Sequence, residues 1–166
     1  MRSRKLSNIY LAGCKLRGTL PNFTTPDSLS SLDLSDNYFT EDGLSSIDLH
    51  SNQLYGSLSS ILSNKTSKFL EVERLDISRN QIGGTIPTSL GLLLKLQWLD
   101  LSINTLSGKI PDSLLQIEAL RHASFRANRL CGEIPQGRPL NIFPPVTYAH
   151  NLCLCGRPLP PCKGKK

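Results

Sequence analysis

Residues 96–111 read LQWLDLSINTLSGKIP, and this stretch decides the fold. The same order of apolar residues, one asparagine, one glycine and a final Ile-Pro occurs in VERLDISRNQIGGTIP at 72–87. It occurs again in LRHASFRANRLCGEIP at 120–135, so the starts at 72, 96 and 120 are 24 residues apart. Three consecutive copies with a fixed period indicate a chain of repeated units, each of which stacks on its neighbours to bury an apolar core.

Weaker copies extend the pattern toward the N-terminus, so the repeats span residues 6–135. They begin at residues 6, 29 and 44, and Cys14 stands at the asparagine position of the first copy. The second copy breaks off after Phe39, and the step from residue 29 to residue 44 is only 15 residues. Because this step is shorter than a complete unit, we expect a truncated second repeat with irregular geometry.

Each copy predicts two short extended segments and one helical turn. The apolar-x-apolar alternation of Leu99 and Leu101 is typical of a short strand with those side chains inward. The asparagine follows at a bend, where its amide offers both the donors and the acceptor that buried backbone groups need. The Gly-x-Ile-Pro segment is extended again and ends at proline, which has no N–H for a ladder. Leucines three residues apart, such as Leu90 and Leu93, then predict a helical turn. The asparagine column contains Asn37, Asn52, Asn80, Asn104 and Asn128.

This unit resembles the plant-type leucine-rich repeat, whose unit of about 24 residues ends in Leu-x-Gly-x-Ile-Pro. The resemblance implies an α/β repeat fold. It is a solenoid with a parallel β-sheet on its concave face, and with short helices or 3-10 turns on its convex face. The chain then divides into a basic N-terminal tail (1–5), about six repeats (6–135), a C-terminal cysteine cap (136–162) and a basic C-terminal tail (163–166).

The net charge of +6 comes from the two ends of the chain. Three basic residues lie in the first five and three in the last four, so the 19 basic residues leave 13 to balance 13 acidic ones. Two basic tails are not the basic folded face that nucleic acid requires, and we expect no nucleic-acid partner. No apolar stretch approaches the roughly 18 residues of a membrane span. The first residues are too polar for a signal peptide, so we expect the leader to be absent.

Four of the five cysteines gather at the C-terminal end, where a solenoid needs a cap over its last coil. They are Cys131, Cys153, Cys155 and Cys162, and their spacing alone allows three disulfide connectivities. Paired Cys-x-x-Cys knuckles, which structural zinc sites favour, are absent from this spacing, and we expect no metal there.

Residues 148–163 resemble the C-terminal cap of polygalacturonase-inhibiting proteins and their extracellular relatives, and Cys131 matches the first cap cysteine of that family. The resemblance implies Cys131–Cys153 and Cys155–Cys162 disulfides and leaves Cys14 as a free thiol. Asn22-Phe-Thr and Asn64-Lys-Thr are glycosylation acceptor triplets. Disulfides and glycans together favour an extracellular location, at the cell wall or the plasma-membrane exterior.

The pattern predicts no enzyme and no cofactor. His50 and His122 lie on strands three repeats apart, roughly 14 Å at ~4.8 Å per strand, which is too far for a catalytic pair. The aspartates that recur at one strand position could mimic a paired-carboxylate site. We interpret them instead as the ordinary solvent-facing residue of a Leu-Asp-Leu-Ser repeat: Asp33, Asp48, Asp76 and Asp100.

A binding surface on the concave face is the functional prediction that remains. Trp98, the only tryptophan, occupies an outward strand position. Tryptophan and arginine dominate binding hot spots, so we expect Trp98 to contact a partner, with packing on Arg74 as the alternative. The candidate partner-binding residues are Arg74, Asp76, Arg79, Trp98, Asp100, His122 and Arg126.

Three functional hypotheses follow. The first is an extracellular plant-defence module, similar to polygalacturonase-inhibiting proteins, that binds a pathogen cell-wall-degrading enzyme; a pectic saccharide is a further candidate ligand. The second is an ectodomain fragment of a receptor-like protein or receptor kinase that binds a peptide or co-receptor in signalling. The third, an intracellular scaffold, predicts reduced cysteines and no glycans. A chain end four residues after Cys162 favours the first hypothesis, whereas the missing N-terminal cap favours a fragment.

Overall fold

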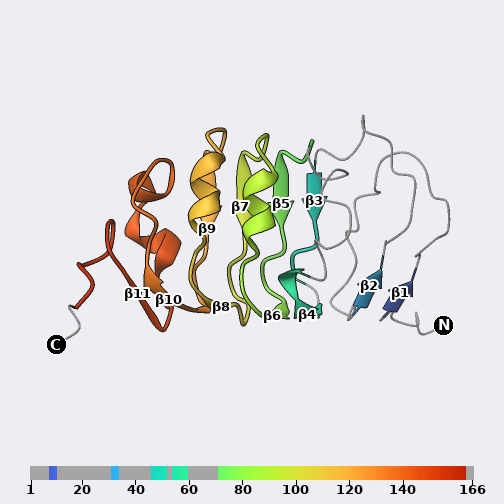
Figure 1. Cartoon of the computed structure of the whole chain (residues 1–166). Helices are drawn as coiled ribbons and strands as arrows, with labels where there is room; N and C mark the ends of the chain where they lie inside the picture. The colour runs from blue at the N-terminus through green and yellow to red at the C-terminus, as the bar shows by residue number, and fades with distance from the viewer. Residues whose placement is uncertain (1–7, 11–30, 34–45, 52–53, 60–70, 164–166) are drawn as a thin grey trace.

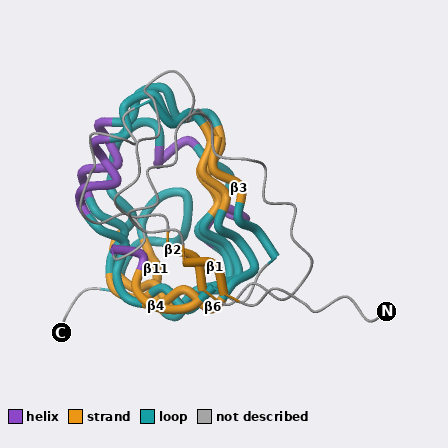
Figure 2. Tube along the Cα trace, turned by 90° about the vertical axis from the view of Figure 1, so that its right-hand side faces the viewer, coloured by secondary structure: helices purple, strands orange, loops and turns teal. Residues whose placement is uncertain are grey.

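Successive coils of the chain stack side by side and form a solenoid (Figure 1). The computed structural model describes residues 8–10, 31–33, 46–51, 54–59 and 71–163. Seen along the stack, four of the coils carry one strand each of a concave sheet, and short 3-10 helices lie across from that sheet (Figure 2). The described coils therefore have the strand-on-one-side, helix-on-the-other arrangement that the repeat predicts.

The concave sheet consists of four parallel strands in the order β3-β5-β7-β9. The middle residue of every strand points inward and is buried, because side chains alternate across a strand. The register aligns Ser46, Arg74, Trp98 and His122 in one row across the sheet and Asp48, Asp76, Asp100 and Ser124 in the next. The strands are β3 (Ser46–Asp48), β5 (Arg74–Asp76), β7 (Trp98–Asp100) and β9 (His122–Ser124).

A second series of parallel strands follows each asparagine, as the Leu-x-Gly motif predicts. The strands β4 and β6 pair with each other, and β8, β10 and β11 form a three-stranded sheet. A bridge between Thr85 and Ser107 connects the two groups. The bounds are β4 (Tyr55–Ser57), β6 (Gln81–Gly83), β8 (Ser107–Gly108), β10 (Arg129–Glu133) and β11 (Cys153–Cys155).

In residues 71–163 the helical turns are 3-10 helices: η2 (Thr88–Leu92) and η3 (Asp112–Gln116) in the repeats, with η4 (Leu140–Ile142) and η5 (Pro145–Tyr148) in the C-terminal segment. Both repeat helices begin after a proline, whose fixed φ suits a helix start. They pack so closely that a Cβ on Gly91 would lie 2.4 Å from the Ser113 carbonyl oxygen. Glycine is therefore required where these two helices meet.

The asparagine column ties neighbouring coils together through their backbones. The Oδ1 atom of Asn104 accepts the N–H of Ile82 at 3.0 Å, and its Nδ2 donates to the Ile77 carbonyl at 3.0 Å, both in the preceding coil. Asn80 and Asn128 make the equivalent bonds, each to the coil that precedes its own. The prediction is confirmed for these three asparagines. Asn37, Asn52 and Cys14 lie outside the described residues.

The residue before each asparagine adopts left-handed backbone, although none of these residues is glycine. Their φ angles lie between 54° and 59°, in Ser51, Arg79, Ile103, Ala127 and His150. Left-handed backbone is unfavourable by roughly 1–2 kcal/mol for such residues. The bend persists because the asparagine side chain satisfies the backbone groups that it exposes, and the sequence gives no glycine signal for it.

The C-terminal segment continues the solenoid as a further coil before it ends. Phe125 and Ala127 donate their N–H groups to the carbonyls of Thr147 and Ala149 at 2.8 and 2.9 Å. Asn151 accepts the N–H of Leu130 at 3.1 Å and so extends the asparagine column by one position that sequence analysis missed. The cap therefore covers the last repeat with the same backbone pairing that joins the repeats.

A tyrosine and two disulfides fix the cap. Tyr148 stacks on Phe125 with ring centroids 5.7 Å apart, and its hydroxyl donates to the Leu140 carbonyl at 2.6 Å. Burial raises the pKa of this hydroxyl, which therefore stays a donor. The disulfides join the pairs that the resemblance implies, Cys131–Cys153 and Cys155–Cys162.

The first two strands stand apart from the concave sheet. β1 (Asn8–Tyr10) and β2 (Ser31–Asp33) form a two-stranded sheet of their own, and the concave sheet begins at β3. The short step between the second and third copies thus coincides with a break between two sheets. Within the described part of the chain, no helix has the length and apolar character to cross a bilayer.

Replacing Asn104 with alanine should lower the free energy of unfolding by about 3 kcal/mol, because it removes the hydrogen-bond partner of a buried N–H and of several carbonyls in two coils. Urea unfolding followed by far-UV circular dichroism measures this loss. Gln81→Ala removes an amide from an exposed strand position and should change stability by less than about 0.5 kcal/mol. Equal effects of the two changes would contradict the role assigned to the asparagine column.

Candidate functional site

The concave patch contains residues from β5, β7, β9 and the turns that follow these strands. All seven candidate partner-binding residues lie in this region: Arg74, Asp76, Arg79, Trp98, Asp100, His122 and Arg126. Alternation along each strand gives them the face opposite the buried leucines. The structure thus brings the predicted residues onto one surface. There they have three different roles: some form a stack, some hold the turns, and some are exposed charges.

Arg74, Trp98 and His122 form a continuous stack across three strands. The rings of Trp98 and His122 are 3.7 Å apart between centroids and inclined by only 14°. The guanidinium of Arg74 lies 4.5 Å from the centroid of the Trp98 ring on the neighbouring strand. Packing of Trp98 on Arg74, the alternative of the sequence analysis, is therefore present, and the second contact with His122 was not predicted.

The stack holds Trp98 in a fixed position that is only partly exposed. Its Nε1 atom is inaccessible and has no hydrogen-bond partner. A stacked aromatic pair contributes about 0.5–1.5 kcal/mol beyond the area that it buries, and the cation contact adds to it. Trp98 is therefore part of the sheet's own packing as well as a candidate contact residue.

The aspartates of the concave patch hold the turns that follow their strands. Asp76 is only 7% exposed; its Oδ1 accepts the N–H and the hydroxyl of Ser78 at 3.1 and 2.8 Å, and its Oδ2 pairs with Arg74 at 3.2 Å. Asp100 accepts the N–H of Ser102 at 2.9 Å. These carboxylates thus have a structural role that explains their recurrence in the Leu-Asp-Leu-Ser pattern.

The two remaining arginines are the most accessible charges of the concave patch. Arg79 and Arg126 are both exposed, on turns two strands apart, or roughly 10 Å at ~4.8 Å per strand. Ile103 lies between them in the turn that follows β7 and is 39% exposed. The sequence places Ile103 at an outward position before Asn104, yet only the structure shows that it separates two cations.

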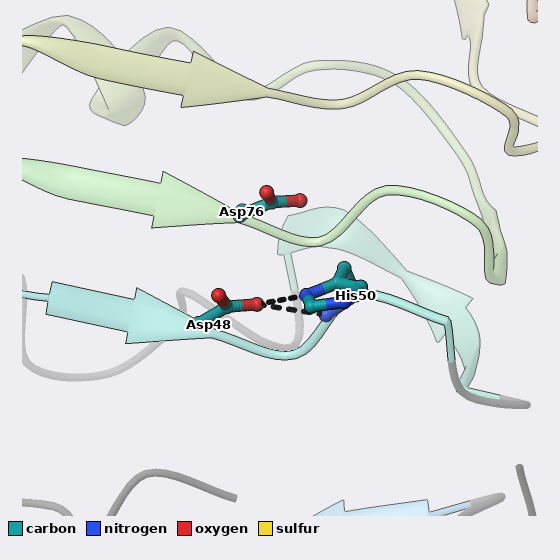
Figure 3. A group of neighbouring side chains, drawn as sticks. All are labelled: Asp48, His50 and Asp76. Atoms are coloured by element: carbon teal, nitrogen blue, oxygen red, sulfur yellow. Dashed lines mark hydrogen bonds and ion pairs between the residues drawn. The ribbon is translucent and has the colours of Figure 1, made fainter. Parts of the chain in front are cut away.

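A second group of side chains lies beside the concave patch, on β3 and β5. The ring of His50 bonds through Nδ1 to Oδ1 of Asp48, and Asp76 lies on the neighbouring strand (Figure 3). One ligand atom from each residue lies within 4.8 Å of the others. The bond from Asp48 is the main cause that raises the pKa of His50 above 6.5, while partial burial opposes it.

Sequence analysis did not single out this group, because it compared His50 only with His122. The signal that could have revealed it is the Asp48-x-His50 spacing, which puts both side chains on one face of the chain. The register of Asp48 with Asp76 then adds the second carboxylate. All four cysteines of the cap are in disulfides, so none of them has a free thiol to bind a metal ion.

Comparisons with known proteins agree with this geometry. The family model described as Leucine Rich Repeat matches residues 28–47, 71–93 and 95–117. A chain in the crystal structure of the BIR3–SERK2 complex from Arabidopsis thaliana is 32% identical with a TM-score of 0.63, over 99% of this chain and 77% of that one. The chain belongs to the plant-type extracellular leucine-rich repeat family.

Two further solved structures that resemble this leucine-rich repeat chain are ectodomains. The BIR2 ectodomain from A. thaliana is 30% identical with a TM-score of 0.63, over 91% of this chain and 70% of that one. The GASSHO1/SCHENGEN3 receptor-kinase ectodomain from A. thaliana, in complex with CASPARIAN STRIP INTEGRITY FACTOR 2, is 25% identical with a TM-score of 0.58, over 95% of this chain and 22% of that one. No curated protein is significantly similar.

These findings give the leucine-rich repeat chain an extracellular location, in agreement with its two disulfides. The narrower similarity to polygalacturonase-inhibiting proteins stays a prediction. Asn22 and Asn64, the predicted glycosylation sites, lie outside the described residues, and their modification also stays a prediction.

Trp98→Ala should lower the free energy of unfolding by about 1–2 kcal/mol, less than the ~2–5 kcal/mol expected for the buried Leu99→Ala. A double-mutant cycle between Trp98→Ala and His122→Ala should give a coupling of about 1 kcal/mol, because the two rings stack directly. Urea unfolding followed by circular dichroism supplies all four free energies. Strict additivity would show that the stack does not stabilise the sheet.

Asp48→Asn should lower the pKa of His50, because the bond to Asp48 is the main cause of its elevation. In the wild type, a raised folded-state pKa means that the pair stabilises the fold at acid pH. This contribution is lost as the pH rises through the folded-state pKa. An NMR titration of the imidazole signals measures the change. Asp112→Asn, on the helical side of the coil, should leave the His50 titration unaltered; an unaltered titration in Asp48→Asn would contradict the assignment.

Proposed function

We propose that this chain is an extracellular recognition module that binds a protein or peptide partner on its concave patch, in the manner of a receptor-like ectodomain. In this proposal the chain acts by binding and not by catalysis. The partner class is a peptide or the ectodomain of a co-receptor kinase. The location within this proposal is the plasma-membrane exterior.

The observation that carries this proposal is the fixed stack of Arg74, Trp98 and His122 beside two exposed arginines. Binding loses less free energy when the contact residues are already ordered, because fewer rotamers are immobilised on association. Tryptophan and arginine are also the residues most enriched in binding hot spots. The concave patch therefore offers a packed aromatic centre with exposed cations at its edge.

The relatives support a protein or peptide as the bound species. Two related ectodomains were solved in complex with a peptide or factor: GASSHO1/SCHENGEN3 with CASPARIAN STRIP INTEGRITY FACTOR 2, and HAESA with an IDA peptide hormone. A third structure is the complex of two proteins, BIR3 and SERK2. An acidic group on a partner would pair with Arg79 and Arg126, which have the accessible guanidinium groups for a bidentate contact.

A second candidate function is inhibition of a pathogen polygalacturonase in plant defence at the cell wall. The supporting observation is the cap, whose cysteines pair as the resemblance to polygalacturonase-inhibiting proteins implies. A pectic saccharide would use the same two arginines through its carboxylates. On either candidate, we propose a secreted glycoprotein that carries its glycans on Asn22 and Asn64.

Surface plasmon resonance on the immobilised chain tests both candidates, with the SERK2 ectodomain and a fungal polygalacturonase as separate probes. The receptor-like reading predicts binding of the SERK2 ectodomain; the second candidate predicts binding and inhibition of the polygalacturonase. Arg79→Glu combined with Arg126→Glu should weaken the interaction by about 2 kcal/mol, or roughly 30-fold.

Arg129→Glu is the matched control, because Arg129 is equally exposed but lies on β10 of the second sheet. It should leave the affinity unchanged. Loss of binding in Arg129→Glu, together with full binding by the double variant, would show that the interface lies outside the concave patch. Failure of both probes to bind would reject both candidate partners.

A further inference from the structure

We infer that Asp48, His50 and Asp76 form a binding site for a divalent transition-metal ion of the Zn²⁺ class at the edge of the concave patch. The site is independent of the proposed partner. It uses one imidazole nitrogen and two carboxylate oxygens, contributed by two neighbouring strands of the sheet and the turn after β3.

The three side chains converge closely enough to share one ion. Their candidate ligand atoms lie within 4.8 Å of one another, and the ring of His50 already contacts Asp48 (Figure 3). Ligands about 2.0–2.2 Å from a tetrahedral zinc ion lie roughly 3.3 Å apart. Small side-chain rotations of Asp76 and His50 therefore bring all three atoms to coordinating distance, without a change in the backbone.

The backbone holds both carboxylates in place before an ion arrives. Ser78 donates its N–H and its hydroxyl to Oδ1 of Asp76, at 3.1 and 2.8 Å. The N–H of His50 donates to Oδ1 of Asp48 at 3.3 Å. Such secondary hydrogen bonds orient ligating carboxylates in metal sites and sustain their affinity. Ordered ligands also lower the entropy that binding has to overcome.

Access and charge also suit a cation. The side chains of His50, Asp48 and Asp76 are 52%, 27% and 10% exposed, so an ion can reach the group from solvent. Two carboxylates face the ion, with Asp100 one strand further along the same row. Arg74 is the opposing charge, because its guanidinium pairs with Oδ2 of Asp76 at 3.2 Å. An ion that binds Asp76 through Oδ2 must displace Arg74.

The donor set selects the kind of metal. Ca²⁺ and Mg²⁺ prefer oxygen ligands alone and more of them, whereas imidazole with carboxylates suits Zn²⁺ and its neighbours. Three protein ligands also leave one position of a tetrahedral ion open toward the concave face. A carboxylate or imidazole from outside the chain could complete the coordination there.

Isothermal titration calorimetry with zinc chloride tests the inference on the full chain with intact disulfides. The background carries Cys14→Ser, so that the thiol contributes nothing. We expect one Zn²⁺ per chain, with His50→Ala and Asp76→Asn each weakening the affinity at least tenfold. His150→Asn is the control, because it removes another exposed imidazole and asparagine tolerates the left-handed backbone of that position. It should bind Zn²⁺ like the parent.

Two further measurements keep the result decisive. Arg74→Gln should tighten Zn²⁺ binding several-fold, because it removes the competing cation; unchanged affinity would exclude Oδ2 of Asp76 as a ligand. In an NMR titration, Zn²⁺ should shift the His50 imidazole signals before those of His150. The same spectra also show whether a variant has misfolded. Equal Zn²⁺ affinity in His50→Ala and the parent, or tighter binding of Ca²⁺ than of Zn²⁺, would overturn the inference.

Discussion

The asparagine column is the interaction on which the rest of the structure depends. Each coil makes a bend that leaves backbone groups buried between coils, and one amide side chain satisfies groups of both coils at once. Because every coil contacts only its neighbours, these bonds fix the spacing and register of the whole stack. The rows of outward side chains on the concave sheet follow directly from that register.

Local patterns in the sequence were sufficient for the fold of the repeats. A fixed period, alternating leucines and one asparagine per unit specify strand, bend and second strand, because each feature has one physical reason to occur there. The extra coil in the cap escaped prediction, since Pro145 and Tyr148 depart from the usual residues, while Asn151 and the backbone pairing of the coil persist. The left-handed residues escaped as well, because they carry side chains of five different kinds.

The residues of the concave face could be predicted from the sequence, but the contacts between their side chains could not. Alternation along the strands placed Arg74, Trp98 and His122 outward, and the period placed them in one row. Which of these side chains are in contact depends on their rotamers, which the sequence pattern does not specify. The stacking of His122 on Trp98 was therefore found only in the structure. The Asp48–His50 contact was also found only in the structure. With Asp76 it forms the inferred metal site, although the aspartates also hold the turns that follow their strands.

With the proposed function, one surface combines structural and recognition roles. Its aspartates hold the turns, its stacked centre packs across the sheet, and its two accessible arginines are the proposed contacts to a partner. Hydroxyl-radical footprinting of the chain with and without the SERK2 ectodomain tests this division most directly. The account predicts reduced oxidation of Trp98 and His122 on the concave patch, with no change at Leu92 and Leu94 beside η2. Protection of Leu92 and Leu94, with Trp98 and His122 oxidised as in the free chain, would contradict it.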